Sequence, residues 1–334
     1  MSTVFAFTQR NIVMNKEKMI VLLLICTGTV FLIINTAAAV VKGDCEVCHV
    51  LFPGVPQYEL PYTLCIECHS NADPDTVKIF GRSKVPVVYN SVKPSRHLAG
   101  GNFYYLARGF GERKGHNVAG VSPSDTKFNN NPPGYVRTND PSTIGYSDTK
   151  TLKCSGSNGC HGNRNIEDPV KAIMGTHHAV DQPVDGTTTA RSYRYLKNTG
   201  TVKGVTGFEE EEWNRNSTPQ KHNEYSSSID QFCESCHGGF HREEKSGPWF
   251  RHPTGVTLPK EYEYTEYNTN APVARASSFE FSKSEIVPGV DSVICLSCHM
   301  AHASPYESML RWDYDAIVTG EEGKDGCLIC HTGK

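Results

Sequence analysis

Cys295–His299 reads CLSCH, and five other places in the chain end in the same way, with a second cysteine followed at once by histidine. Four of them share the short spacing C-x-x-C-H, at Cys45–His49, Cys65–His69, Cys233–His237 and Cys327–His331. The last, CSGSNGCH at Cys154–His161, has five residues between its cysteines. Together the six sites use every cysteine of the 334-residue chain except Cys26. The fold must therefore be organised around what these sites hold.

C-x-x-C-H is the pattern of c-type haem attachment. Each thiol adds to one vinyl group on the porphyrin edge, and the next residue then lies beneath the ring, where its imidazole can bind iron. Zinc sites and disulfides also use paired cysteines, but neither explains a histidine after the second cysteine each time. We therefore predict six haems, attached at Cys45, Cys48, Cys65, Cys68, Cys154, Cys160, Cys233, Cys236, Cys295, Cys298, Cys327 and Cys330. The predicted proximal iron ligands are His49, His69, His161, His237, His299 and His331.

The site with the longer spacing needs extra backbone freedom. Its loop must bulge away from the ring, and Gly156 and Gly159 can supply the required conformations. The alternative is a Cys154–Cys160 disulfide followed by a histidine with no role. Five haems are therefore strongly supported, and the sixth is expected because its pattern ends like the others.

The N-terminus indicates export. Lys16 and Lys18 precede an apolar run from Ile20 to Ile34, and Ala37–Ala39 follow, which is the layout of a secretory signal peptide. We expect cleavage after Ala39, which removes Cys26. The alternative is an uncleaved membrane anchor, because residues 19–41 are about long enough to span a bilayer.

The second axial ligands should come from the histidines outside the motifs, since a bound iron takes two. His302 lies three residues after His299, and His241 lies four after His237, so neither can reach the far face of its own haem. Each should bind a neighbouring haem instead. At most one of the adjacent His177 and His178 is expected to bind. The eight candidates are His97, with the least support, and His116, His177, His178, His222, His241, His252 and His302.

The six attachment motifs predict a multihaem cytochrome c fold, with mostly irregular backbone, short α-helices and a few β-hairpins wrapped around a haem stack, and the composition agrees. The mean hydropathy is −0.43, and porphyrins, as large apolar bodies, would replace much of a conventional core. SYRYL at Ser192–Leu196 and EYEYTEY at Glu261–Tyr267 alternate polar and aromatic residues, as strands do. The first predicts a hairpin over Tyr193–Val205, with an extended loop as the alternative.

The spacing of the sites suggests how the chain is divided. After a signal peptide at 1–39, a hexahaem domain at 40–334 would have three segments. These are an N-terminal two-haem segment at 40–75, a middle segment with one haem at 76–232 and a C-terminal three-haem segment at 233–334.

The C-terminal third resembles the doubled-CXXCH multihaem cytochromes of metal-reducing and related anaerobic bacteria. The residues that carry the resemblance are FCESCHGGFH at Phe232–His241, GPWFRHPTGVTLP at Gly247–Pro259, CLSCHMAHASPYESMLRWDY at Cys295–Tyr314 and the final CLICH. LAGGNFYYLARG, GHNVAG, GTHHAVD and QKHNEYSS are similar to patterns in the same group. The resemblance implies electron transfer in the periplasm or outside the cell. As distal ligands it favours His116, His222, His241, His252, His302 and one of His177 and His178.

The net charge and the number of histidines outside the motifs limit the possible functions. Without residues 1–39 the chain has thirty Lys and Arg against thirty-five Asp and Glu, which does not suit nucleic acid and favours basic redox partners. Because spare histidines can occupy every second axial position, we expect a non-catalytic electron carrier whose partners are other redox proteins. The alternatives are a reductase of nitrite, hydroxylamine or a sulfur oxyanion, and a cytochrome that associates with itself into a filament. Membrane association is expected only if the signal is an uncleaved anchor.

Overall fold

The computed structural model describes fifteen parts of the chain. The chain divides into two units, Met1–Ala39 and Val40–Lys334, and all described residues lie in the second. The predicted signal peptide, the first attachment site at Cys45–His49, and His177, His178, His222 and His241 lie outside the described residues. In the described part, no helix is both long enough and apolar enough to cross a membrane. The described residues are 64–80, 83–107, 112–122, 132–135, 152–176, 184–199, 203–208, 213, 224–240, 252–260, 264, 267, 270–275, 286–318 and 326–332.

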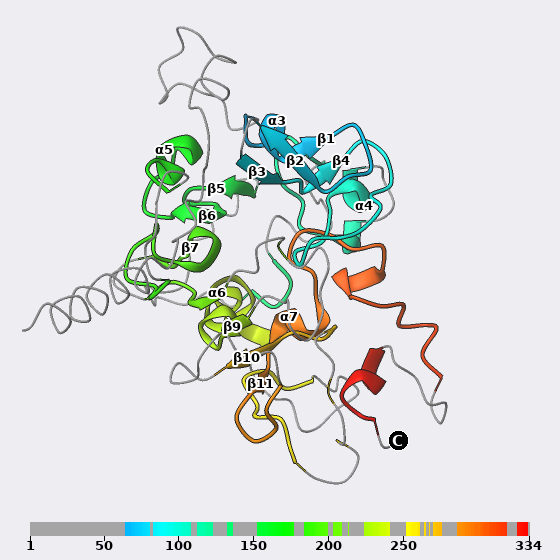
Figure 1. Cartoon of the computed structure of the whole chain (residues 1–334). Helices are drawn as coiled ribbons and strands as arrows, with labels where there is room; N and C mark the ends of the chain where they lie inside the picture. The colour runs from blue at the N-terminus through cyan, green and yellow to red at the C-terminus, as the bar shows by residue number, and fades with distance from the viewer. Residues whose placement is uncertain are drawn as a thin grey trace, which may run out of the picture. The chain divides into compact units, whose positions relative to one another are not determined.

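The first described segment contains one attachment helix and two small sheets (Figure 1). β2 and β3 form an antiparallel pair, and β1 pairs with β4 in parallel. The elements are α3 (Leu64–His69), β1 (Ser70–Asn71), β2 (Val77–Phe80), β3 (Ser83–Pro86), β4 (Tyr89–Asn90), α4 (Tyr104–Ala107) and η1 (Glu112–Lys114).

Two fully buried asparagines hold this segment together. Asn102 donates from its side-chain amide to the Oδ1 of Asn90 at 2.7 Å, and its own Oδ1 accepts the Asn90 backbone N–H at 3.3 Å. The Asn90 amide also donates to the carbonyls of Asp73 and Asp75, at 2.6 and 2.9 Å. Because buried amides must be hydrogen-bonded, this network replaces the regular ladders that such short strands cannot supply.

The middle segment contains a parallel sheet in the order β5-β6-β7. Its helix α5 begins with Pro169 at the first position, and the carboxylate of Asp168 accepts the N–H groups of Val170 and Lys171, both at 2.9 Å. This is the arrangement expected of an N-cap with proline after it. The elements are β5 (Lys153–Ser155), β6 (Gly159–Asn163), α5 (Pro169–Ile173), η2 (Tyr193–Tyr195) and β7 (Leu196–Lys197).

The strand predicted at Ser192–Leu196 was wrong. Tyr193–Tyr195 forms a 3₁₀ turn, because Arg194 and Tyr195 adopt positive φ angles of 47° and 60° that no strand contains. The chain nevertheless returns on itself, since Tyr193 donates to the Val205 carbonyl at 2.7 Å and Val205 donates to the Leu196 carbonyl at 2.8 Å. Of the other predicted strand, only Tyr264 and Tyr267 are described, and neither is in a strand.

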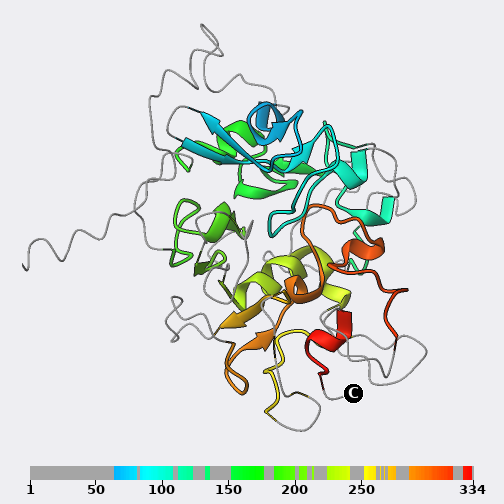
Figure 2. The same cartoon turned by 45° about the vertical axis from the view of Figure 1, so that its right-hand side comes forward.

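The C-terminal segment builds a four-stranded sheet, in the order β11-β10-β9-β8, beside α6 and α7 (Figures 1 and 2). The strands pair antiparallel except β9 with β10. The elements are β8 (Gly207–Phe208), β9 (Glu224–Ser226), α6 (Ser228–His237), η3 (Gly238–Phe240), β10 (Val273–Arg275), β11 (Ser292–Val293), α7 (Cys295–Cys298), η4 (Glu307–Met309) and η5 (Gly326–Ile329).

The buried apolar side chains of the described residues form two modest clusters. One joins η2 to α6 and the C-terminal sheet through residues such as Tyr193, Tyr225 and Ile294. The other joins α4 to the chain around Ala303. The predicted class of mostly irregular backbone with short helices is confirmed, since the longest described helix, α6, has ten residues.

Candidate haem-binding sites

Four of the described attachment sites present their cysteines on a helical turn. The pairs Cys65/Cys68, Cys233/Cys236 and Cys295/Cys298 lie in α3, α6 and α7, and Cys327 lies in η5 three residues before Cys330. Residues three apart on a helix share a face, so both thiols of each pair can reach one edge of a flat ring. None of the ten described cysteines is joined in a disulfide.

The site with the longer spacing brings its cysteines together differently. β5 and β6 pair in parallel with Lys153 opposite Gly159 and Ser155 opposite His161, which sets Cys154 beside Cys160. The three connecting residues make one tight spiral turn, in which Gly156 has a φ of 88°. A Cβ at Gly159 would overlap the backbone of Ser155, so glycine is required there. The site therefore places two thiols side by side and a histidine after the second, as the helical sites do. It does not form the alternative disulfide.

At four of the sites, a hydrogen bond to a backbone carbonyl orients the ring of the motif histidine. Because a carbonyl can only accept, the Nδ1 atoms must carry the protons. The Nε2 atoms then carry no proton and can bind a metal, an orientation typical of ligating histidines. The Nδ1 of His69 donates to Pro86 at 2.8 Å, His161 to Arg194 at 2.9 Å, His237 to Pro133 at 2.7 Å and His299 to Ser308 at 2.7 Å.

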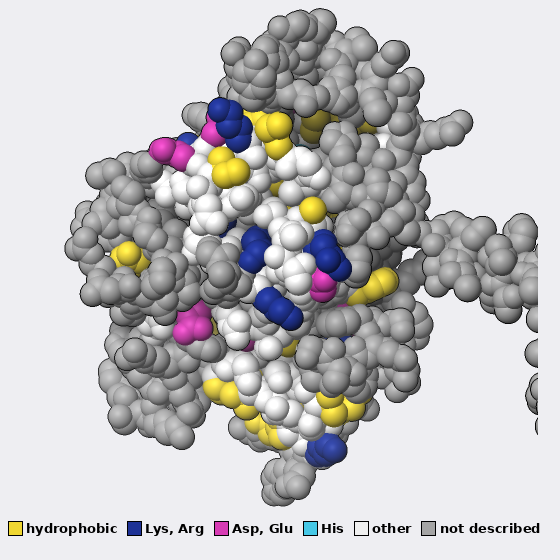
Figure 3. Space-filling model, turned by 90° about the vertical axis from the view of Figure 1, so that its left-hand side faces the viewer, with side chains coloured by type: hydrophobic (Ala, Val, Ile, Leu, Met, Phe, Trp, Pro, Cys, Tyr) yellow, Lys and Arg dark blue, Asp and Glu magenta, His cyan; other side chains and the backbone are white. Residues whose placement is uncertain are grey.

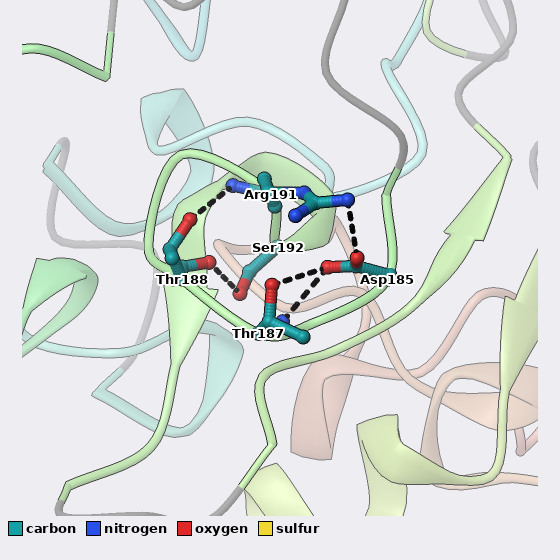
Figure 4. Close-up of polar contacts among 5 residues, drawn as sticks. All are labelled: Asp185, Thr187, Thr188, Arg191 and Ser192. Atoms are coloured by element: carbon teal, nitrogen blue, oxygen red, sulfur yellow. Dashed lines mark hydrogen bonds and ion pairs between the residues drawn. The ribbon is translucent and has the colours of Figure 1, made fainter.

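A polar loop fixes the carbonyl that orients His161 (Figure 4). Asp185 accepts from the hydroxyl of Thr187 at 2.7 Å and pairs with the Arg191 guanidinium at 2.6 Å. Ser192, the residue before η2, donates its hydroxyl to the Thr188 carbonyl at 2.7 Å. The loop therefore holds the start of η2, and η2 presents the Arg194 carbonyl to His161 at its strained, positive-φ position.

Three motif histidines face a histidine from outside the motifs. His252 is exposed, the other five histidines of these pairs are half-buried, and none of the described histidines is seen on the face of the molecule drawn in Figure 3. The ring centres of His116 and His237 lie 6.0 Å apart, those of His161 and His302 6.2 Å, and those of His252 and His331 6.4 Å.

These separations fit an iron held between two imidazoles. A metal–imidazole bond is about 2 Å long and each ring nitrogen lies about 1 Å from its ring centre, so two imidazoles on one metal have centres about 6 Å apart. The residues present therefore fit a haem iron at three sites, with one motif histidine and one other histidine at each.

Burial keeps two of the facing histidines, His116 and His302, neutral. It lowers the pKa of His116 to about 4, with the nearby His237 adding to the effect. It lowers the pKa of His302 to about 3, with His161 the next cause. Only neutral imidazole can bind a metal, so both side chains are in the ligating form at neutral pH.

A three-stranded contact holds His116 and His302, and we call it the clasp (residues 98–103, 114–118 and 300–306). His302 donates its backbone N–H to Gly100 at 2.6 Å, and Ser304 donates to Lys114 at 2.9 Å. Gly101 has a φ of 82°, and a Cβ there would overlap the Ala303 carbonyl. The clasp therefore depends on close backbone approach that the LAGG sequence permits.

The other histidine candidates divide into two groups. The Nε2 of His97 and the Tyr105 hydroxyl are hydrogen-bonded at 2.8 Å. The low rank of His97 among the candidate ligands stays a prediction. His177, His178, His222 and His241 lie outside the described residues, so their assignment as distal ligands stays a prediction, as does the partner of His69 and of His299.

The thiols of successive sites lie close to one another. Cys65 and Cys154 share a hydrogen bond, which lowers the pKa of Cys65, and Cys233 and Cys295 share another, which raises the pKa of Cys233. Electrostatic contacts also join Cys160 to Cys236, and Cys298 to Cys330. The five described sites therefore follow one another in space in the order of the sequence.

Sequence reasoning missed the groups that orient the ligands. The carbonyls of Pro86, Pro133, Arg194 and Ser308 are backbone atoms, so residue type gives no signal for them. Phe240 stacks on His237 with ring centres 6.1 Å apart and an interplanar angle of 13°. Its place three residues after a motif histidine could have suggested such a contact.

Comparison with known proteins agrees with the motif at the C-terminus. The sequence model of the doubled CXXCH motif family matches residues 289–334, which confirms that part of the predicted resemblance. No curated protein matches the chain. Among solved structures, the chain is similar to a filament of outer membrane cytochrome S from Geobacter sulfurreducens, with 20% identity over 83% of this chain and 85% of that chain and a TM-score of 0.44. It is also similar to OmcS nanowires of the same organism, with 18% identity over 89% of this chain and 91% of that chain and a TM-score of 0.42.

Proposed function

We propose that this chain is an exported c-type cytochrome that transfers electrons through covalently bound haems, most of them with two histidine ligands. The observation that carries the proposal is the set of three histidine pairs whose ring centres lie 6.0, 6.2 and 6.4 Å apart, each with one motif histidine. Haem c, when bound, supplies an iron that accepts and releases one electron. The cysteines and histidines of this chain would hold the haem and limit its iron to electron transfer.

The protein side chains favour transfer over catalysis. The thiols fix the orientation of each ring, and carbonyl hydrogen bonds hold the motif histidines still, as at His69 and His299. With haem bound, a second histidine such as His302 would occupy the position that a substrate would need. An iron with both axial positions filled changes little on reduction, which suits electron transfer.

The succession of sites supports transfer along the chain. Cys65 lies beside Cys154, Cys160 near Cys236, and Cys298 near Cys330. Rings attached to neighbouring thiols have neighbouring edges. We propose that electrons pass between sites in sequence order, from the two-haem N-terminal segment to Cys327–His331.

The number of haems is tested by the intact mass of the exported protein. We propose six haems and a polypeptide that begins at Val40. A mass with five haems would contradict the assignment of Cys154, Cys160 and His161. A polypeptide that retains residues 1–39 would contradict cleavage and favour the membrane anchor.

Removal of single histidines tests the axial assignments. In His302→Ala, one haem should lose a ligand and change from low-spin to high-spin, as read by electron paramagnetic resonance. His97→Ala is the matched control, because His97 is also outside the motifs but is hydrogen-bonded to Tyr105. Equal spectra for both variants would contradict the proposed pairing of His302 with His161. A high-spin signal in the unaltered protein that responds to nitrite would favour a reductase.

A further inference from the structure

Two arginines of the described residues are deeply buried, and their surroundings differ. Arg275 is 2% exposed and lies between two carboxylates, Glu224 at 3.5 Å and Asp291 at 3.8 Å. Arg164 is 5% exposed, and the described part of the chain gives it no carboxylate within ion-pair distance. One buried guanidinium is therefore neutralised by its neighbours, and the other is not.

The contacts of Arg164 are weak for a buried cation. Its Nη1 donates to the Ser235 hydroxyl at 3.4 Å, and the guanidinium lies over the Phe232 ring, 5.2 Å from the ring centre. Ser235 also donates its own proton to the Phe232 carbonyl at 2.6 Å. The Nε–H of Arg164 has no hydrogen-bond partner among the described residues.

Arg164 sits where two haem sites meet. It follows His161 by three residues, and its partner Ser235 lies between Cys233 and Cys236 in α6. Both Cys160 and Cys236 are close enough to interact electrostatically with the guanidinium, which lowers the pKa of both thiols against the larger effect of burial. The side chain therefore joins the strand of one site to the helix of the next.

Within the described ranges, the buried guanidinium of Arg164 lacks an anionic partner. A guanidinium stays protonated in proteins, and an unpaired buried charge is strongly unfavourable. A hydroxyl and an aromatic face offset only part of that cost. An anion with two oxygens would satisfy the free Nε–H and the charge together, since guanidinium and carboxylate groups match each other geometrically.

We propose that Arg164 binds a haem propionate at the junction of the sites Cys154–His161 and Cys233–His237. The inference rests on the proposed function, which brings the propionates into the protein. Arg164 is then a positioning residue that also sets reduction potential. Its positive charge favours the ferrous state of the nearest iron, and its hydrogen bonds keep the propionate ionised.

Redox titration of the complete protein at several pH values tests the proposal. In Arg164→Met, one component of the titration should shift to lower potential. Its midpoint should also become dependent on pH, because a propionate without its cation takes up a proton on reduction. Arg164→Lys keeps the charge and should retain most of the native behaviour.

Arg113→Met is the matched control for the loss of one positive charge. The Arg113 side chain is 72% exposed and pairs with Glu307 at 2.9 Å, so water already screens its charge and the titration should not change. A native curve for Arg164→Met at every pH would overturn the proposal. So would a shift without new pH dependence, or a native midpoint that varies with added phosphate, which would indicate a free anion instead.

Haem content separates this proposal from the proposed function. Pyridine haemochrome absorbance and intact mass of the unaltered protein report whether haems are bound at all, and their absence would end both proposals. If Arg164→Met does not fold, the midpoint potentials of Arg164→Lys and of the unaltered protein, compared across pH, still test whether Arg164 binds a propionate. Loss of the bidentate contact should leave a small pH dependence in that variant, and its absence would count against propionate binding.

Discussion

The backbone N–H of His116 donates to the carbonyl oxygen of His302 at 3.0 Å. The two histidines face motif histidines of different sites, His237 and His161. A displacement of either residue is therefore transmitted through one hydrogen bond to the ligand of another site. The clasp should behave as a single unit, and a defect in it should affect both sites together.

Gly101→Ala tests the clasp. The new Cβ would overlap the Ala303 carbonyl, and φ at this position is 82°, so the variant should lose more than about 2 kcal/mol of stability. Thermal unfolding of the haem-loaded protein gives the stability. Electron paramagnetic resonance should show altered signals from the sites of both His161 and His237.

Gly255→Ala separates backbone strain from the clash. Gly255 has a φ of 69°, and its Cβ would meet nothing within 4 Å, so the variant should lose only about 1 kcal/mol. Equal losses in the two variants would show that close approach to Ala303 contributes nothing.

Gly159→Ala should remove one haem and leave the others. The added methyl would overlap the backbone of Ser155 and separate Cys154 from Cys160, so that the two thiols no longer span one porphyrin edge. Intact mass reports the missing haem. Ser157→Ala, in the same connection but half exposed, should keep the full number. A full complement in Gly159→Ala would show that attachment does not need the spiral turn.

Asp230 connects two neighbouring attachment sites. Its Oδ1, buried within α6, accepts the backbone N–H of Cys295 at 2.8 Å at the start of α7. Asp230→Ala should cost about 1–3 kcal/mol, because the buried N–H loses its acceptor. Asp230→Asn should cost less, since its amide oxygen can accept the same bond. Denaturant unfolding measures both, and a larger loss in Asp230→Asn would contradict this role.

The pH dependence of stability should contain a contribution from Asp291. Burial raises the pKa of this carboxyl above its ordinary value of 3.8, although the Val287 N–H and Arg275 oppose the effect. The native state therefore becomes less favoured as pH rises from about 4 through the raised pKa. In that window the stability of Asp291→Asn should fall less steeply than that of the unaltered protein. Unfolding free energies measured across the window test this.

Asp185 supplies a control of opposite sign. Hydrogen bonds from Thr187, followed by the charge of Arg191, lower the pKa of this carboxyl below 3.8. Its contribution to stability is present above that value and is lost as pH falls through the lowered pKa. Asp185→Asn should therefore flatten the acid side of the profile. If the unfolding free energy of both variants changed with pH as steeply as that of the unaltered protein, neither carboxyl would behave as described.

The sequence predicts the attachment residues from local chemistry, because a cysteine pair and the histidine after it are read from adjacent positions. The family match at residues 289–334 and the irregular, short-helix fold confirm the family resemblance and the fold class, and the assignment of the individual attachment residues stays a prediction. His302 was expected to serve a neighbouring site because three residues are too few to reach around its own ring. The ring centres of His302 and His161, a histidine of another site, lie 6.2 Å apart, which is consistent with that reasoning.

The remaining features depend on contacts between distant segments. His116 and His237 are far apart in sequence, and no pattern within either segment indicates that they meet. The strand expected at Ser192–Leu196 is replaced by a 3₁₀ turn at Tyr193–Tyr195, because contacts with the polar loop at 185–192 and with Val205 outweigh the local alternation. Arg164 resembles any surface arginine in sequence, and only its burial marks it out.

In the attachment site at Cys154–His161, the positions of the two sulfur atoms do not depend on the number of residues in the connecting spiral turn. The parallel pairing of β5 with β6 sets where the thiols lie, whereas Ser157, half exposed at the tip of the turn, makes no contribution to that pairing. The Ser157 N–H donates to the Ile166 carbonyl at 3.0 Å, so residues added at this tip would replace that hydrogen bond while the β5–β6 pairing still holds the two sulfurs together. A reporter peptide or a surface-attachment tag inserted there would lie beside Cys154 and Cys160.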